Sequence, residues 1–415
     1  MKKYKLGELL DVTRGASLSG EYYSTEGEFI RLTLGNFDYQ NGGFKENTSK
    51  DDLFFTGTVK PQFILNEGDI ITPLTEQTQG LIGSTARIPQ SGVYIQSQDV
   101  GLVKCNGELL DPDFCYYLLP SQIVKKQLSA GAQQTKIRHT SPDKIKDVTV
   151  FLPELSEQRK IGHILRSIDS QIDNLTAINR NLEQVARQLY DYWFVQFDFP
   201  NSEGKPYKSS GGNMAWNEQL KAYIPREWSV SCLEDVFDII MDRCSNAEQH
   251  THYTPIEVIP RKQMSLNETA PIENAISGLC SYKKNDILLS NRRVYFHKVC
   301  IAPFDGITRD TVIVLRPKQS SYLGFLFQLV FSEHFISYAT LHSYGSEQPV
   351  LSWQTVKRYK FATPDVSLIR QYCNLANDII NQVIDNHNQI RHLKSLRDEL
   401  LPMLLNGQVN CDLSK

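Results

Sequence analysis

The segment from Ser290 to Lys298 places two adjacent arginines beside a tyrosine, a histidine and a lysine. An arginine binds a phosphate group, or the acceptor edge of a guanine, with two parallel hydrogen bonds. A lysine adds a point charge that attracts phosphates. This combination of residues is typical of a loop that contacts a nucleic acid.

The stretch from Thr72 to Gly80 occupies the matching place in the first half of the chain, and it is uncharged apart from Glu76. It is rich in amides and hydroxyls; glutamine bonds well to the edge of an adenine, and threonine serves several bases. Two equivalent loops with different side chains are what the recognition of two different half-sites would require.

A further pair of polar loops, Gly131–His139 and Ser343–Pro349, follows a helical patch in each half, and nearby lysines give the first of them a local positive charge. Any one of these residues also fits a solvated surface loop, so the interpretation depends on the loops as sets. The candidate DNA-binding residues are Thr75, Gln77, Gln79, Arg87, Gln133, Gln134, Lys136, Arg138, Arg292, Arg293, Tyr295, His297, Lys298 and Tyr344.

The sequence lacks the motifs that indicate catalysis: a P-loop, a nucleophile elbow, an H-E-x-x-H zinc motif, an EF-hand loop and the N-P-P-[YF] motif that holds a flipped adenine. His250 and His252 lack a third metal ligand, and the eight cysteines form no C-x-x-C pair. We therefore expect a binding protein with no catalytic residue, no metal site and no cofactor of its own.

The composition is that of an ordinary globular protein with several domains: 415 residues, 40% hydrophobic residues and a net charge of -3. The net charge excludes a wholly basic nucleic-acid binder, although binding responds to the charge in the groove rather than to the total. The N-terminus lacks the apolar core of a signal peptide. The longest apolar run, Tyr322–Phe331, is far shorter than the roughly 18 residues of a membrane helix. We expect a cytoplasmic protein.

Four short segments recur in the same order about 211–224 residues later, which indicates an internal repeat. The predicted pairs are 9–12 with 233–236, 67–71 with 284–288, 99–103 with 310–314, and 151–159 with 361–370. Each half begins with short β-type runs, continues with a helical patch and ends, after Pro153 or Pro364, in a long helical pattern. Two similar mixed α/β domains are therefore predicted, with coincidental strand and turn chemistry as the alternative.

Both long helical patterns repeat apolar residues every seven positions, as the seam of a coiled coil does. Asn179 and Asn386 lie at seam positions, where a buried amide costs stability and fixes the register. Each helix would span roughly 40 residues, or about 60 Å, and an antiparallel pair is expected because the chain returns across a domain between them. The alternative is that each helix packs only on its own domain. The predicted seam residues are Ile161, Ile168, Leu175, Leu182, Leu189, Ile379, Leu393 and Leu400.

Segments at the ends of these helices resemble those of the specificity subunits of type I restriction-modification systems. Leu152–Ile161 looks like the family's P-L-x-E-Q-R-K-I helix start, and Leu189–Phe199 is similar to its F-x-x-W-F-V-x-F helix end. Ile224–Trp228 resembles the I-P-x-x-W opening of a second recognition domain, and Leu400–Gln408 resembles the closing L-L-x-x-L-L-x-G segment. The start of the second helix, Asp365–Gln371, departs from the pattern because it lacks the Glu-Gln pair.

The resemblance implies an α+β fold in which two similar mixed α/β target-recognition domains are joined by two long helices that form an antiparallel coiled coil, with internal pseudo-two-fold symmetry. The first target-recognition domain would be 1–153 and the first spacer helix 154–199. A linker and the second target-recognition domain would follow at 200–364, and the second spacer helix with a C-terminal tail at 365–415. Each domain would read one half of a bipartite, asymmetric DNA target, and the helices would set the length of the gap.

The resemblance also implies partners for a non-catalytic chain. Two methyltransferase subunits would dock on the spacer helices and methylate adenine N6 with S-adenosylmethionine. Restriction subunits that use ATP and Mg²⁺ are a further expected class of partner. A coiled-coil protein-interaction scaffold with two ligand-binding domains is the alternative function, and an enzyme with an unrecognised site is a third hypothesis.

Overall fold

The computed structural model describes residues 1–38, 42–76, 80–130, 138–244 and 250–408. The chain divides into two compact units: unit 1 contains Met1–Ser170 and Leu393–Lys415, and unit 2 contains Gln171–His392. Both long helices cross this division, so each unit holds one part of each helix. The predicted boundaries at residues 153, 199 and 364 instead separate the recognition domains from the long helices, and they stay a prediction.

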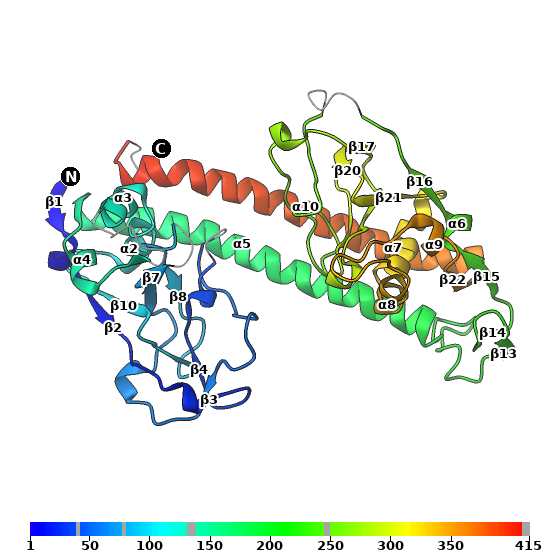
Figure 1. Ribbon diagram of the computed structural model, residues 1–415, viewed down its shortest axis with the longest axis horizontal. Helices are drawn as coiled ribbons and strands as arrows, with labels where there is room; N and C mark the ends of the chain where they lie inside the picture. The colour runs from blue at the N-terminus through cyan, green and yellow to red at the C-terminus, as the bar shows by residue number, and fades with distance from the viewer. Residues whose placement is uncertain (39–41, 77–79, 131–137, 245–249, 409–415) are drawn as a thin grey trace. The chain divides into compact units, whose positions relative to one another are not determined.

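Unit 1 contains a four-stranded antiparallel sheet, a second small sheet and short helices (Figure 1). The first sheet has the order β2 (Leu10–Arg14), β10 (Val100–Cys105), β6 (Ile70–Pro73) and β8 (Ala86–Arg87). The second has the order β3 (Tyr23–Ser24), β5 (Phe54–Phe55), β4 (Phe29–Arg31) and β9 (Tyr94–Ile95). Two further pairs join β1 (Lys2–Lys5) to β12 (Thr149–Leu152) and β7 (Thr75–Glu76) to β11 (Arg138–His139). The short helices are α1 (Leu6–Leu9), α2 (Pro112–Leu118), α3 (Gln122–Ala130) and α4 (Pro142–Lys146).

Unit 2 repeats the main antiparallel sheet and the pair of strands that corresponds to β1 and β12, and in its described residues two-stranded pairs stand in place of the second four-stranded sheet. Its antiparallel sheet has the order β16 (Phe237–Ile240), β21 (Val312–Pro317), β18 (Ile287–Ser290) and β19 (Val299–Ile301). Two-stranded pairs are formed by β15 (Ser229–Cys232) with β22 (Lys360–Thr363), β17 (Leu279–Tyr282) with β20 (Gly306–Arg309), and β13 (Met214–Asn217) with β14 (Ala222–Pro225). The short helices are α6 (Leu233–Val236), α7 (Leu323–Phe331), α8 (Glu333–Leu341) and α9 (Trp353–Val356).

The predicted internal repeat is confirmed, because the strands follow the same connections in both units. The predicted register of 67–71 with 284–288 agrees with the ladders. In the predicted pair of 151–159 with 361–370, Pro153 is equivalent to Pro364 as expected, but Phe151 is equivalent to Ala362 and not to Phe361. The turn before β6 and β18 is also shared: Gly68 and Asn285 both have positive φ angles, 84° and 71°. Asparagine tolerates this left-handed conformation better than most residues, so the turn survives without glycine.

Two of the predicted registers are wrong. Segment 99–103 was predicted to match 310–314, but the match is shifted by one residue. Val100 lies opposite Pro73 and Val312 lies opposite the equivalent Ser290, so Val100 corresponds to Val312. Segment 9–12 was predicted to match 233–236, but the match is shifted by three residues. The helix equivalent to α6 (Leu233–Val236) is α1 (Leu6–Leu9). Short apolar runs look alike in neighbouring registers, and only the hydrogen-bonded ladder distinguishes them.

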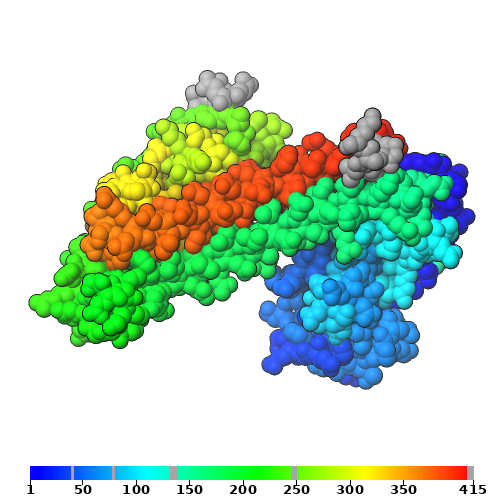
Figure 2. Space-filling view, turned by 180° about the vertical axis from the view of Figure 1, so that it is seen from behind, coloured from blue at the N-terminus to red at the C-terminus, as the bar shows by residue number. Residues whose placement is uncertain are grey.

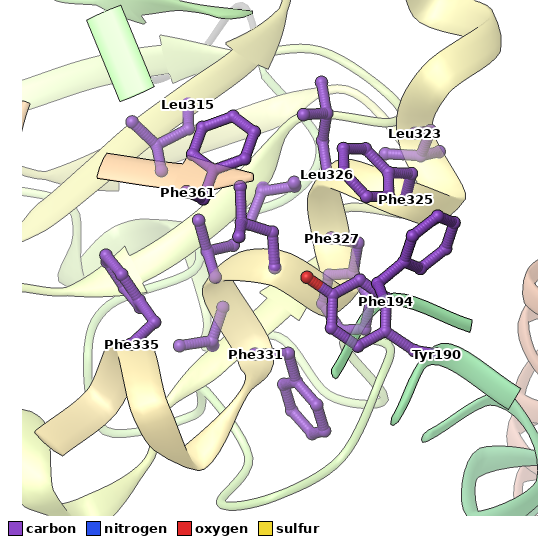
Figure 3. Packing of buried hydrophobic residues seen from close by; sticks show 14 of the residues in the cluster. Tyr190, Phe194, Leu315, Leu323, Phe325, Leu326, Phe327, Phe331, Phe335 and Phe361 are labelled. Carbon is purple, nitrogen blue, oxygen red and sulfur yellow. The ribbon is translucent and has the colours of Figure 1, made fainter. Parts of the chain in front are cut away.

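Many aromatic side chains pack together with aliphatic ones in the core of unit 2 (Figure 3). All nine residues of α7 are buried, so the longest apolar run in the sequence forms a core helix. The Phe194 ring, at the end of the first long helix, lies 4.8 Å from the ring centres of both Phe325 and Tyr372. These edge contacts attach the long helices of unit 2 to its domain.

The first long helix, α5 (Leu155–Tyr190), continues as a π-helical turn from Asp191 to Val195, and the second is α10 (Val366–Leu405). In unit 2, the Asn386 side-chain amide donates to Asn179 Oδ1 at 2.7 Å, and both residues are buried. In unit 1, Arg397 pairs with Asp169 at 2.9 Å. Residue numbers therefore rise along α5 as they fall along α10, which confirms the predicted antiparallel pairing.

The two helices lie side by side in unit 2 in both views (Figures 1 and 2). Of the predicted seam residues, Ile161 and Ile168 are buried. The others, Leu175, Leu182, Leu189, Ile379, Leu393 and Leu400, are half-buried.

Candidate nucleic-acid interface

A small three-stranded patch follows β18 in unit 2. Arg292 and Tyr344 each form an antiparallel bridge with Val350, one on either side of it. Residues directly opposite each other on neighbouring strands share a face, so these three side chains emerge from the same side. Arg292 and Tyr344 are both exposed, which places a cation and an aromatic ring together at the surface.

A tight turn displays Tyr295 beside this patch. The 3₁₀ turn Val294–Phe296 is flanked by Arg293 and His297, both in the left-handed region with φ of 46° and 53°. Non-glycine residues hold this conformation at an energetic cost, and such strain concentrates at functional sites. The Tyr295 side chain is 49% exposed, whereas Val294 is buried.

Two of the predicted residues on this loop are occupied inside the protein. His297 is buried, with Nε2 2.9 Å from the Phe331 carbonyl oxygen, and burial lowers the pKa of this imidazole. Lys298 donates its ammonium group to the Ile256 carbonyl at 2.6 Å. These two side chains position the turn rather than face a ligand.

In unit 1 the residue equivalent to Arg292 is Thr75. The Thr140 N–H donates to the Leu74 carbonyl at 2.9 Å, as the Leu351 N–H does to the Asn291 carbonyl at 2.8 Å. Thr75 and Arg292, which directly follow these two carbonyls, therefore occupy equivalent positions in the two units. Thr75 is buried, and its hydroxyl lies 3.4 Å from Asp99 Oδ1.

The remaining candidates of unit 1 divide into two groups. Arg87 is committed internally, because it pairs with Asp113 at 2.7 Å and stacks on the Tyr116 ring. The backbone of Arg138 pairs with that of Glu76, and its side chain lies outside the described residues. Five more candidates lie wholly outside the described residues: Gln77, Gln79, Gln133, Gln134 and Lys136.

Sequence reasoning missed two features. Arg261 stacks on the Phe296 ring at 4.0 Å, although it lies far from that loop in sequence. Unit 1 also has a polar pocket of about 350 Å³, whose lining includes Arg31, Lys50 and Asp99. No motif could have indicated this pocket, because its walls come from separate segments of the chain.

Within the described ranges, no group of three or more His, Cys, Asp or Glu side chains is placed to hold a metal ion. Among the helices of those ranges, none combines the length and apolar character needed to cross a membrane.

The chain is similar to known proteins over most of its length. It is 23% identical, over 322 residues, to the type I restriction enzyme MjaIX specificity subunit of Methanocaldococcus jannaschii, covering 72% of this chain and 69% of that protein. It is 21% identical, over 379 residues, to the type I restriction enzyme HindI specificity subunit of Haemophilus influenzae, covering 76% and 81%.

The fold is also that of a solved structure. The S subunit of a type I restriction-modification system from M. genitalium superposes with a TM-score of 0.60 at 15% identity, covering 97% of this chain and 95% of that one. A family model described as the type I restriction modification DNA specificity domain matches residues 1–184 and 225–387. Because these matched residues make up most of the chain, this protein belongs to the family of type I restriction-modification specificity subunits.

Proposed function

We propose that units 1 and 2 each read one half of a bipartite DNA target, and that the chain itself performs no catalysis. The equivalence of Thr75 and Arg292 carries this proposal. One backbone position, after the same strand of the same sheet, holds a buried threonine against Asp99 in unit 1 and an exposed arginine in unit 2. Side chains this different select different base edges, so the target is asymmetric.

Each unit supports the proposal with a surface of suitable chemistry. Arg292, Tyr295 and Tyr344 provide a cation and aromatic rings in unit 2. In unit 1, the polar pocket adjoins Thr75, because Asp99 both lines the pocket and bonds Thr75. Polar groups and cations of this kind bond to base edges and phosphates.

Methyltransferase subunits are the proposed partners of the long helices. Within unit 2, α5 and the π-helical turn that continues it expose Ile178, Val185 and Tyr192 at intervals of seven residues, with exposed fractions of 46%, 50% and 38%. A seven-residue apolar stripe on a helix is the surface that another amphipathic helix covers. Two such subunits would bring S-adenosylmethionine and methylate adenine in the cytoplasm, and restriction subunits would bring ATP and Mg²⁺; this chain needs no cofactor of its own.

Methylome sequencing tests the reading function. Cells with and without this chain, each expressing the methyltransferase partner, are compared for N6-methyladenine. We expect a single split motif that is lost with the chain. Methylation that persists unchanged without the chain would contradict the proposal and favour an interaction scaffold.

The length of the paired helices tests how the gap is set. One facing heptad is removed from α5 and one from α10, so that the seam stays continuous. We expect a shorter gap between the methylated half-sites, whose own sequences do not change. An unchanged gap would show that the helices do not determine the spacing.

A further inference from the structure

Two arginines of unit 2 stack on the ring of Phe296. The guanidinium carbon of Arg261 lies 4.0 Å from the ring centre, and that of Arg293 lies 6.0 Å from it. Stacking on an aromatic ring holds the plane of a guanidinium in place and leaves its N–H edges available to a ligand. Arg261, Phe296 and Arg293 are together called the Phe296 clamp.

The arginines of the clamp have no acidic partner within the described ranges. Arg316 and Arg397, by contrast, each pair with an aspartate, at 2.7 and 2.9 Å. A paired arginine is largely neutralised and serves the fold. The described residues contain no carboxylate paired with Arg261 or Arg293, so their charge is available to an anion.

The clamp is also pre-organised by the backbone. The Arg293 N–H donates to the Pro349 carbonyl at 2.9 Å, and the His297 N–H donates to the Val294 carbonyl at 2.8 Å. These bonds fix both ends of the turn, whose flanking residues have positive φ angles. A rigid turn loses little conformational entropy when a ligand binds.

The positive charge around the clamp affects its neighbour. Burial lowers the pKa of the Lys298 ammonium group, and the charge of Arg261 lowers it further. The charge of Glu257 acts in the opposite direction, so the shift shows that Arg261 lies near Lys298 and does not by itself measure the local potential.

We propose that the Phe296 clamp binds DNA backbone phosphates and so holds unit 2 on the duplex, while Arg292 on the adjoining patch reads a base. The inference rests on the proposed reading function and deepens it by dividing one surface into two roles. Phosphate contacts fix position without sequence information, whereas base contacts discriminate. In this proposal Arg261 contacts DNA although it lies outside the basic loop Ser290–Lys298.

Salt dependence separates the two roles. The full chain, with its methyltransferase partner, is titrated against a labelled duplex that carries the methylome-derived target and against a scrambled duplex, at several KCl concentrations. We expect Arg261→Ala and Arg293→Ala to weaken binding to both duplexes about five- to tenfold near 0.1 M salt, and to reduce the slope of log K against log salt by about 0.9 each. Arg292→Ala should weaken binding to the target much more than to the scrambled duplex.

Two further variants test the stacking geometry and the net charge. Arg261→Lys keeps the charge but loses the planar stack, so we expect the wild-type salt slope with weaker binding. Arg226→Ala is the matched control, because Arg226 is an exposed arginine of unit 2 that follows β14 directly. It removes the same charge and should leave both duplex affinities unchanged.

The possible outcomes distinguish the clamp from the reading function. An unchanged salt slope in Arg261→Ala, with wild-type circular dichroism, overturns the clamp. A loss confined to the target duplex overturns the phosphate assignment and makes Arg261 a base reader. A wild-type complex that binds both duplexes equally contradicts the reading function, while the slopes still decide the clamp.

Discussion

The loops after β6 in unit 1 and after β18 in unit 2 begin at equivalent places in the fold and carry different side chains there. The loop of unit 1 buries Thr75 against Asp99, whereas the loop of unit 2 exposes Arg292 and stacks two further arginines on Phe296. In unit 1 the Thr140 N–H donates to the carbonyl of Leu74, the residue before Thr75. In unit 2 the Leu351 N–H donates in the same way to the carbonyl of Asn291, the residue before Arg292.

This comparison shows how one scaffold supports two readers. The hydrogen bond at the start of each loop, from Thr140 to Leu74 and from Leu351 to Asn291, joins two main-chain groups, which every side chain leaves in place. Apolar residues of the ladders, such as Ile70 and Ile287, belong to the cores of the two units. The loop side chains can therefore differ between the units without loss of the fold.

The largest expected difference concerns the charge pair at the start of β18 in unit 2. Arg316 donates two hydrogen bonds, both at 2.7 Å, to Asp286, which is buried. The equivalent of Arg316 in unit 1 is Lys104, which is exposed. Arg316→Ala strands a buried carboxylate, so we expect it to lower the free energy of unfolding of unit 2 by about 3 kcal/mol. Lys104→Ala should change that of unit 1 by less than about 0.5 kcal/mol.

Denaturant titration can follow the two units separately. All four tryptophans of the chain, Trp193, Trp216, Trp228 and Trp353, lie in unit 2, so tryptophan fluorescence reports its unfolding, and far-UV circular dichroism reports both units. Equal losses from the two substitutions would show that the buried pair is no more important than its exposed counterpart.

The second prediction concerns the variable position itself. Arg292→Ala should reduce discrimination at one base pair of one half-site by about 10- to 100-fold, because a bidentate arginine–base contact contributes about 1–3 kcal/mol. Thr75→Val should affect only the other half-site. Competition binding against targets with single base-pair changes measures both effects. A loss spread over both half-sites would contradict the assignment of one half-site to each unit.

Much of the fold could be predicted from the sequence, because periodicity reports the face that a helix buries. Asn179 and Asn386 interrupt an apolar seam, and the structure places them in contact. The site could be predicted less well. The composition of Ser290–Lys298 indicates a basic loop, but the left-handed turns at Arg293 and His297 determine which side chains turn inward. Arg261 reaches this loop only through the tertiary fold, and local sequence carries no sign of it.

The third prediction concerns the hydrogen-bonded pair of Asn179 and Asn386, which occupy different positions in the internal repeat. The repeat aligns Asn179 with Ile390 and Asn386 with Leu175, so apolar residues occupy the matching positions. Asn179→Leu leaves the buried Asn386 amide without its partner, and we expect a loss of about 1–2 kcal/mol in unit 2. The double variant Asn179→Leu with Asn386→Leu should recover that loss, because an apolar seam is stable without the amides.

A double-mutant cycle read by tryptophan fluorescence measures the coupling between the two asparagines. Additive single losses, with no recovery in the double variant, would mean that each amide acts alone. Recovery of stability together with altered spacing of the half-sites would show that the pair serves the register rather than stability.

The last expected effect is a pH dependence that unit 2 has and unit 1 lacks at the matching helix position. Glu183 on α5 accepts the Met264 N–H at 2.7 Å, and burial raises the pKa of its carboxyl to about 7. The repeat places Lys394 at the equivalent position of α10, in unit 1. Only unit 2 therefore buries a carboxyl group at this place.

The sign follows from the raised pKa of Glu183. Between its ordinary pKa of 4.5 and about 7, folded unit 2 holds a proton that the unfolded chain releases, so this contribution to stability decreases as pH rises through that window. The slope is at most that of one proton, about 1.4 kcal/mol per pH unit. His297 acts in the opposite direction, because burial lowers its pKa from 6.5.

The difference between wild type and Glu183→Gln, followed by tryptophan fluorescence from pH 5 to 8, isolates the carboxyl group, since glutamine keeps an oxygen that can accept the Met264 N–H. We expect the stability of wild type relative to Glu183→Gln to fall from pH 5 to 7 and then to level off; parallel profiles would show that water reaches Glu183 and that the carboxyl group titrates as it does in the unfolded chain.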